Sequence, residues 1–84
     1  MNKLTIQFDI IVKLGNRVLF WVNLITENEK RNLCYSRHHR GWSWDSGENE
    51  PEMSDKLRAV FHGKKGDAAL NKVYEYGESV TIEA

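Results

Sequence analysis

Alternating apolar and polar positions open the chain. The even positions of residues 4–14 are all apolar, whereas the odd positions are mostly polar. A period of two, with β-branched and aromatic side chains on one side, predicts a β-strand. A second β-rich run, residues 17–26, follows Gly15 and Asn16. The two runs therefore predict a β-hairpin.

The same pattern predicts how the two strands pair. A two-residue turn at Gly15 and Asn16 would place Asn23 opposite Phe8, on the apolar face. A three-residue loop over 15–17 matches apolar with apolar instead, pairing Leu14 with Val18, Val12 with Phe20, Ile10 with Val22, and Phe8 with Leu24. Because a slip of one residue exchanges the two faces of a strand, we expect the three-residue loop.

The rest of the chain predicts two more short strands, two helices and a returning strand. Residues 33–39 and 42–44 are the expected third and fourth strands. Pro51 at a first helical position and Gly63 at the stop predict the first helix, with Met53, Leu57, Val60 and Phe61 on its inner stripe. Asp67 is expected to cap a second helix that runs through Tyr76 and stops at Gly77, with Ala69, Leu70, Val73 and Tyr74 inward.

Residues 79–83 alternate again, with Val80 and Ile82 inward, and complete the predicted architecture. We expect a single α+β domain, residues 1–84. Its mostly antiparallel sheet has four to five short strands, and the two helices are inserted before the last strand.

Composition narrows the class of protein. The chain has 84 residues, with 12 basic and 12 acidic side chains, so whole-molecule attraction to nucleic acid or to a membrane does not drive binding. The single cysteine, Cys34, excludes an internal disulfide framework and a multi-cysteine zinc site. The start of the chain lacks the pattern of a secretory signal, and no window is apolar for the length of a membrane span. We expect a soluble cytoplasmic protein that does not associate with membranes.

Residues 30–44 form a basic-aromatic segment without an acidic side chain. Its basic members are Lys30, Arg31, Arg37, His38, His39 and Arg40, and its rings are Tyr35, Trp42 and Trp44. Such residues can neutralise phosphates and stack on unpaired bases, so an RNA- or single-strand-DNA-binding domain is one alternative, with Lys30, Arg31, Arg37, His38 and Arg40 as its contacts. The plainest interpretation is a solvated hairpin. Arginine and aromatic side chains also dominate protein interfaces.

No enzyme motif stands out. His38 and His39 are adjacent on a predicted strand, so they point to opposite faces and cannot share a metal ion. A His-dependent ribonuclease or toxin-like enzyme using either histidine is a second alternative, although most small proteins could supply the same residue types. We expect no catalytic residue, no cofactor and no metal site.

The second face of the first hairpin suggests a function. Ile11, Leu19, Trp21 and Ile25 would share it, and two helices can cover only one face of a small sheet. Either one helix packs on each face and these residues join the core, or they form an exposed apolar patch. Exposed apolar patches usually mark association surfaces. Our main hypothesis is a non-enzymatic protein that binds a larger macromolecular partner, itself a protein, through Trp21, Leu19, Ile11, Tyr35, Arg37, Arg40, Trp42 and Trp44. Phage or mobile-element inhibitors and modulators of host machines often have this size, and a homodimer through the same face is a further alternative.

Overall fold

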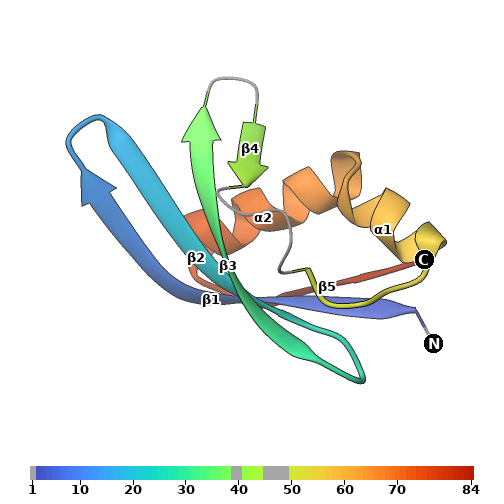
Figure 1. Ribbon diagram of the computed structural model, residues 1–84. Helices are drawn as coiled ribbons and strands as arrows, with labels where there is room; N and C mark the ends of the chain where they lie inside the picture. The colour runs from blue at the N-terminus through green and yellow to red at the C-terminus, as the bar shows by residue number, and fades with distance from the viewer. Residues whose placement is uncertain (1, 39–40, 45–49) are drawn as a thin grey trace.

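Four strands follow one another along the chain, and a fifth returns after two helices (Figure 1). The computed structural model describes residues 2–38, 41–44 and 50–84. The strands are β1 (Lys3–Leu14), β2 (Arg17–Ile25), β3 (Lys30–His38), β4 (Gly41–Trp44) and β5 (Val80–Glu83), and the helices are α1 (Asp55–Phe61) and α2 (Lys64–Tyr76). They form one antiparallel sheet in the order β4-β3-β2-β1-β5. The predicted α+β fold, with both helices before the last strand, is confirmed.

The core lies between the helices and one face of the sheet. Leu4, Ile6, Phe20, Val22, Leu24, Leu33, Tyr35 and Ile82 contribute from the strands, and Leu57, Phe61, Ala69, Leu70 and Val73 from the helices. Met53, Val60, Tyr74 and Val80 are partly buried against this cluster. Both predicted helical stripes and the inward side of the last strand therefore face the core as expected.

Both helices start at different residues from those predicted. Helix α1 begins at Asp55, because the Ser54 hydroxyl accepts a hydrogen bond from the Leu57 N–H at 3.2 Å and caps it. Pro51 lies buried ahead of the helix. Helix α2 begins at Lys64, directly after Gly63, and so starts three residues before the expected Asp67. The two helices meet at a close corner that requires glycine at position 66. An added Cβ there would lie 1.6 Å from the Phe61 carbonyl oxygen.

The predicted hairpin register is wrong. Leu14 pairs with Arg17, so the turn has two residues, Gly15 and Asn16, and Gly15 has a positive φ of 60°. Asn23 does not meet Phe8, because β1 contains an irregularity between Phe8 and Ile10. Asp9 is the extra residue of this β-bulge, and a bulge lets both halves of a strand keep their apolar side toward the core.

The bulge exchanges the face on which each β1 residue lies. Before it, Ile6 and Phe8 lie on the core face, opposite Leu24 and Val22. Beyond it, Ile11 pairs with Phe20 and packs against the core. Ile11 was expected on the second face, and that placement is wrong. Ile10, Val12 and Leu14 lie there instead.

Candidate protein-binding face

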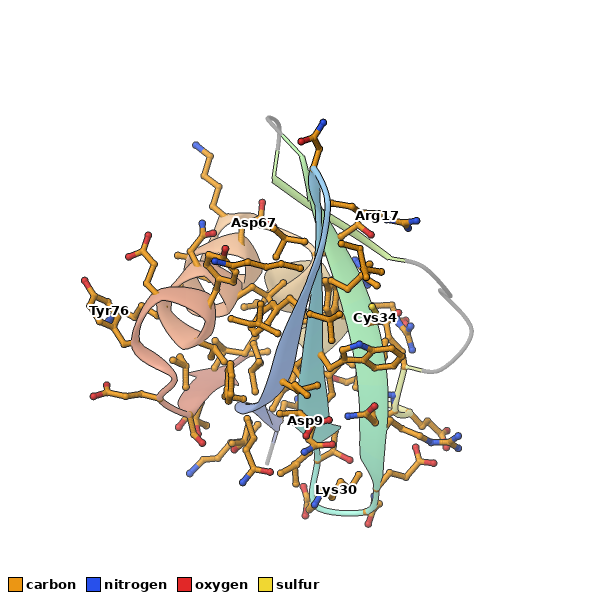
Figure 2. All side chains as sticks on the ribbon, turned by 90° about the vertical axis from the view of Figure 1, so that its left-hand side faces the viewer. Asp9, Arg17, Lys30, Cys34, Asp67 and Tyr76 are labelled. Carbon is orange, nitrogen blue, oxygen red and sulfur yellow. The ribbon has the colours of Figure 1, made fainter. Side chains whose placement is uncertain are left out.

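Both helices pack on the same side of the sheet. Figure 2 shows the strands edge-on, with Asp67 and Tyr76 on the helical side and Arg17 and Cys34 on the other. None of the described helices covers that other side, which we call the outer face. The choice left open by the sequence is therefore decided: the helices do not divide between the two faces.

A group of apolar side chains gathers on the outer face of the β1–β2 hairpin. We call Ile10, Val12, Leu14, Leu19 and Trp21 the outer-face patch. Ile10 is 49% exposed and Leu14 is 58% exposed, and the other three are half-buried. Leu14 stands at the end of the hairpin, which projects away from the helices (Figure 1).

Strand pairing makes the patch contiguous. Ile10 lies opposite Trp21, and Val12 lies opposite Leu19. Side chains of directly opposed residues contact each other on one face of an antiparallel pair. On the far side of β2, Trp21 pairs with Cys34. Cys34 therefore also lies on the outer face, yet it is only 6% exposed.

A ladder of polar side chains bounds the patch on the side that lies away from the hairpin turn. The Asn23 side-chain amide donates to the Gln7 Oε1 at 3.2 Å. The Asn32 side-chain amide donates to the Asn23 Oδ1 at 3.0 Å and to the Asp9 Oδ2 at 2.9 Å. These four side chains run across β1, β2 and β3, so the outer face has a polar part and an apolar part.

Charged side chains of opposite sign border the two ends of the patch. Arg17 lies at the hairpin end, opposite Leu14, and Asp9 lies in the polar ladder at the other end. The Arg17 guanidinium donates to the Ser36 hydroxyl at 3.3 Å, across the edge of the patch. The apolar surface is therefore bordered by a cation at the end of the hairpin.

Tyr35, the ring of the basic-aromatic segment whose side chain the structure describes, is not available for stacking on a ligand. Tyr35 is 1% exposed and part of the core, and burial together with the charge of Glu50 raises its pKa. Arg31 pairs with Glu29 at 2.8 Å, whereas Lys30 is exposed. The backbones of Arg37 and His38 pair with those of Trp42 and Gly41. Arg40 and the side chains of Arg37, His38, Trp42 and Trp44 lie outside the described part of the chain.

Two glutamates after β4 have structural contacts of different kinds. The Glu50 carboxylate accepts from Arg58 at 3.4 Å and lies 2.8 Å from the His62 Nε2. The Glu52 backbone N–H donates to the Glu29 Oε2 at 2.6 Å, which connects the β2–β3 turn to the segment before α1. The Glu50 side chain is therefore held by basic side chains of α1 and of the residue that follows it.

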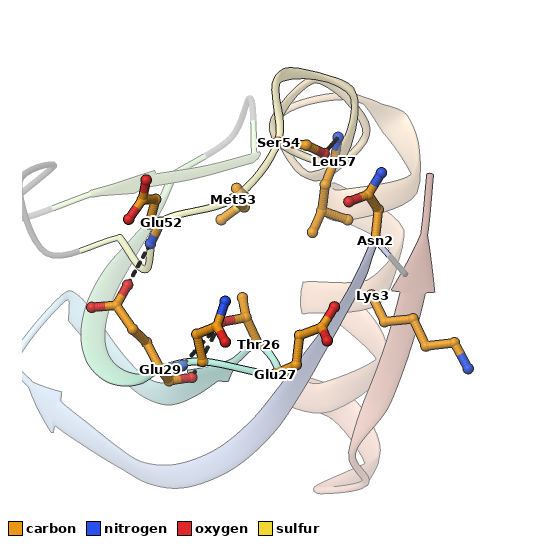
Figure 3. Close-up of a pocket in the computed structure, with 10 residues that line it drawn as sticks. Asn2, Lys3, Thr26, Glu27, Glu29, Glu52, Met53, Ser54 and Leu57 are labelled. Carbon is orange, nitrogen blue, oxygen red and sulfur yellow. Dashed lines mark hydrogen bonds between the residues drawn. The ribbon is translucent and has the colours of Figure 1, made fainter.

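A cavity of about 390 Å³ lies beside the hydrogen bond between Glu52 and Glu29 (Figure 3). Its walls carry Lys3, Glu27, Glu29 and Glu52, with Leu57 and Met53 on the helical side. Lys3 also pairs with Glu83 at 3.5 Å. Within the described ranges, no three histidine, cysteine, aspartate or glutamate side chains come together in a way that could hold a metal ion.

Comparison of the chain with protein-family models, with curated proteins and with solved structures gives no match. In the part of the chain that the structure describes, neither helix has the length and apolar character needed to cross a bilayer.

Three residues of the outer-face patch were missing from the prediction. Trp21 and Leu19 were predicted on this face, but Ile10, Val12 and Leu14 were assigned to the core. One signal could have identified them: Gln7 and Asn23 form a natural pair of amides, and pairing them requires the two-residue turn together with one extra residue in β1.

Proposed function

We propose that the protein is a small binding protein that performs no catalysis and attaches to a larger protein through the outer-face patch. The observation that carries this proposal is the position of both helices on one side of the sheet, opposite Ile10, Leu14 and Trp21. An apolar surface that stays in water has a cost that contact with a partner removes. An inhibitor or modulator of a larger machine acts in this way, by occupying one of its surfaces.

The chemistry of the patch describes the partner. Trp21, with Ile10 opposite it and Leu19 on the same face of β2, fits an apolar surface, and tryptophan is among the side chains that contribute most to protein interfaces. Arg17 at the border of the patch, opposite Leu14, fits a carboxylate beside that surface. The partner we propose is a folded protein with an apolar site bordered by an acidic side chain.

The nucleic-acid alternative has less support from the described residues. Tyr35 is buried and so offers no ring to a base, and Arg31 has a carboxylate partner. A protein-binding role uses contiguous residues that are exposed or half-buried on the outer face, and it needs no rearrangement of the core.

Capture by matched variants tests the proposal. The tagged protein, Leu14→Asp and Ile10→Asp are used to capture proteins from a lysate of the source cells, after nuclease treatment and at moderate salt. Tyr76→Asp is the control, because Tyr76 is 68% exposed on the helical side and the same charge is added there. The captured protein is then purified, and its affinity for each variant is measured by calorimetry.

The wild type and Tyr76→Asp should bind one protein with equal affinity, and Leu14→Asp and Ile10→Asp should bind it at least about tenfold more weakly. Equal affinity in all four proteins would place the interface elsewhere. Self-association of the wild type that Leu14→Asp abolishes would make the patch a homodimer seam and overturn the proposal.

A further inference from the structure

The fifth strand forms one edge of the sheet. β5 is the last strand in the sheet order, and no described strand pairs with its outer side. The Ala84 N–H donates to the Asn2 carbonyl at 3.1 Å, and the register continues from this pair through Leu4 with Ile82 and Ile6 with Val80. Hydrogen-bonded and non-bonded pairs alternate in an antiparallel ladder. The N–H and C=O groups of Thr81 and Glu83 therefore point away from β1.

A groove runs along this edge, beneath α2. Its volume is about 340 Å³, and its walls are Lys65, Ala68, Ala69 and Lys72 from α2 and residues 80–83 from β5. The alanines are small, which leaves space between the helix and the outward backbone of Thr81 and Glu83. An edge with unpaired backbone groups beside an open groove is the arrangement to which proteins add a strand from a ligand.

The helical wall of the groove is basic. Lys65 and Lys72 are both exposed and line it, about two helical turns apart. The acidic residue of the groove, Glu83, is on the outer face with Thr81, since Ile82 and Val80 occupy the core side of β5. There Glu83 pairs with Lys3 at 3.5 Å. The helix-facing side of an added strand would therefore meet two cations.

We propose that the β5 edge binds an extended acidic segment of a partner protein as an additional antiparallel strand. The outward backbone groups of Thr81 and Glu83 pair with the segment. Its helix-facing side chains are an acidic residue near Lys65, a small apolar residue against Ala68 and Ala69, and an acidic residue near Lys72. Since same-face positions in a strand are about 6.8 Å apart, two acidic residues four positions apart match the reach of the two lysines.

A second copy of this chain fits the edge less well. Pairing β5 with a copy of itself would bring the Lys65 and Lys72 side chains of two helices to the same seam. Like charges across an interface are unfavourable. The charge of the groove therefore selects an acidic strand over another β5. This surface is separate from the outer-face patch, so its occupancy does not depend on the function proposed above.

The test uses a short capped peptide in which every second residue is threonine. The residues between the threonines are, in order, glutamate, valine and glutamate. Binding to the full chain is measured by fluorescence anisotropy at low and moderate salt. One peptide is N-methylated at the amides that would face β5, and its matched control is N-methylated at the alternate amides. The double variant Lys65→Glu/Lys72→Glu is compared with the double variant Lys30→Glu/Lys56→Glu. The second variant is the control, because it changes the net charge equally at two other exposed lysines.

The unmodified peptide and the alternate-methylated peptide should bind equally, and methylation of the β5-facing amides should weaken binding at least about tenfold. The double substitution at Lys65 and Lys72 should have an effect of the same size, while the control pair and Leu14→Asp bind as the wild type does. Thr81→Pro, which removes one outward N–H, should weaken binding without changing the melting temperature by more than a few degrees.

Three results would overturn the proposal. The first is equal binding of the two methylated peptides, which would show that the backbone edge is not used. The second is the absence of binding at millimolar peptide. The third is a dimer of the free protein that Thr81→Pro dissociates, which would make a second copy the occupant of the edge.

Discussion

Asn23 lies directly opposite Gln7 across β1 and β2, and its side-chain amide donates to the Gln7 Oε1 at 3.2 Å. This pair accounts for two features of the molecule. It fixes a register in which Asp9 is left over as a bulge, and it begins the polar ladder that ends the outer-face patch. Beyond the bulge, the core face continues with Ile11 and the outer face with Ile10.

Deleting Asp9 should preserve the fold. Removal of the extra residue leaves Phe8 opposite Val22 and Ile10 opposite Trp21, as they are now. The lost contact is the hydrogen bond from Asn32, so we expect a decrease of about 1 kcal/mol in the free energy of unfolding. Urea denaturation measures it.

Deleting Gln7 is the matched control. With β2 and the turn unchanged, this deletion moves Phe8 to the outer face and Asp9 to the core face opposite Val22. We expect a loss of about 3 kcal/mol or more, the scale of an uncompensated buried charge. Equal stability of the two deletion variants would contradict the bulge at Asp9.

Gly66→Ala should destabilise the protein strongly, although alanine is the better helix former. An added methyl group would overlap the Phe61 carbonyl at the corner between α1 and α2, so we expect a loss of about 2 kcal/mol or more. At Gly77, where φ is 67° and nothing lies within 4 Å, Gly77→Ala should cost about 1 kcal/mol from backbone strain alone. Thermal unfolding compares them, and a Gly66→Ala variant as stable as wild type would refute the close corner.

Cys34 should react slowly with a thiol reagent until Trp21 is truncated. The thiol is on the outer face but is 6% exposed, and Trp21 is its cross-strand neighbour. We expect Trp21→Ala to increase the rate of modification by Ellman's reagent about tenfold, since reaction requires access to the sulfur. Val80→Ala, which loosens packing on the core face, is the control. A rate that changes equally in both variants would indicate global opening instead of local cover.

Acidification should weaken the attachment of the β2–β3 turn. Hydrogen bonds from the Glu52 N–H and from Arg31 hold the pKa of Glu29 below its ordinary value of 4.5. A carboxylate with a lowered folded-state pKa contributes stability above its unfolded pKa and loses it as the pH falls through the folded one. The free energy of unfolding should therefore decline below about pH 4.5, and this decline should be smaller in Glu29→Gln. Parallel pH profiles for the two proteins would show that Glu29 makes no such contribution.

The sequence predicted the elements and their order because each has a local cause. The alternation of residues 4–14, the stripe through Leu57 and Phe61, and the glycine at 77 depend on neighbouring residues only. The layered fold followed from these elements. Its helix starts were misplaced because Ser54, three residues after Pro51, supplies the cap, and because Gly66 permits a tight corner that depends on the other helix.

The candidate site was predicted only in part, for a different reason. A rule of strict alternation assigns every residue of a strand from the first one, so a single bulge at Asp9 reverses all later assignments. Trp21 and Leu19 belong to the strand without the bulge and were placed correctly. Ile11 was assigned to the wrong face. Tyr35 was expected to be available to a partner, but it points from β3 into the core between the sheet and the helices.

Site-specific photocrosslinking tests the central proposal, attachment through the outer face, most directly. A photoreactive benzophenone side chain is introduced at Leu14 in one protein and at Tyr76 in another, and both are irradiated in a lysate of the source cells. We predict that the Leu14 variant forms a covalent adduct with one protein and that excess wild-type chain competes for it, while the Tyr76 variant forms none. The same adduct from both positions, or an adduct from Tyr76 alone, would contradict attachment through the outer face.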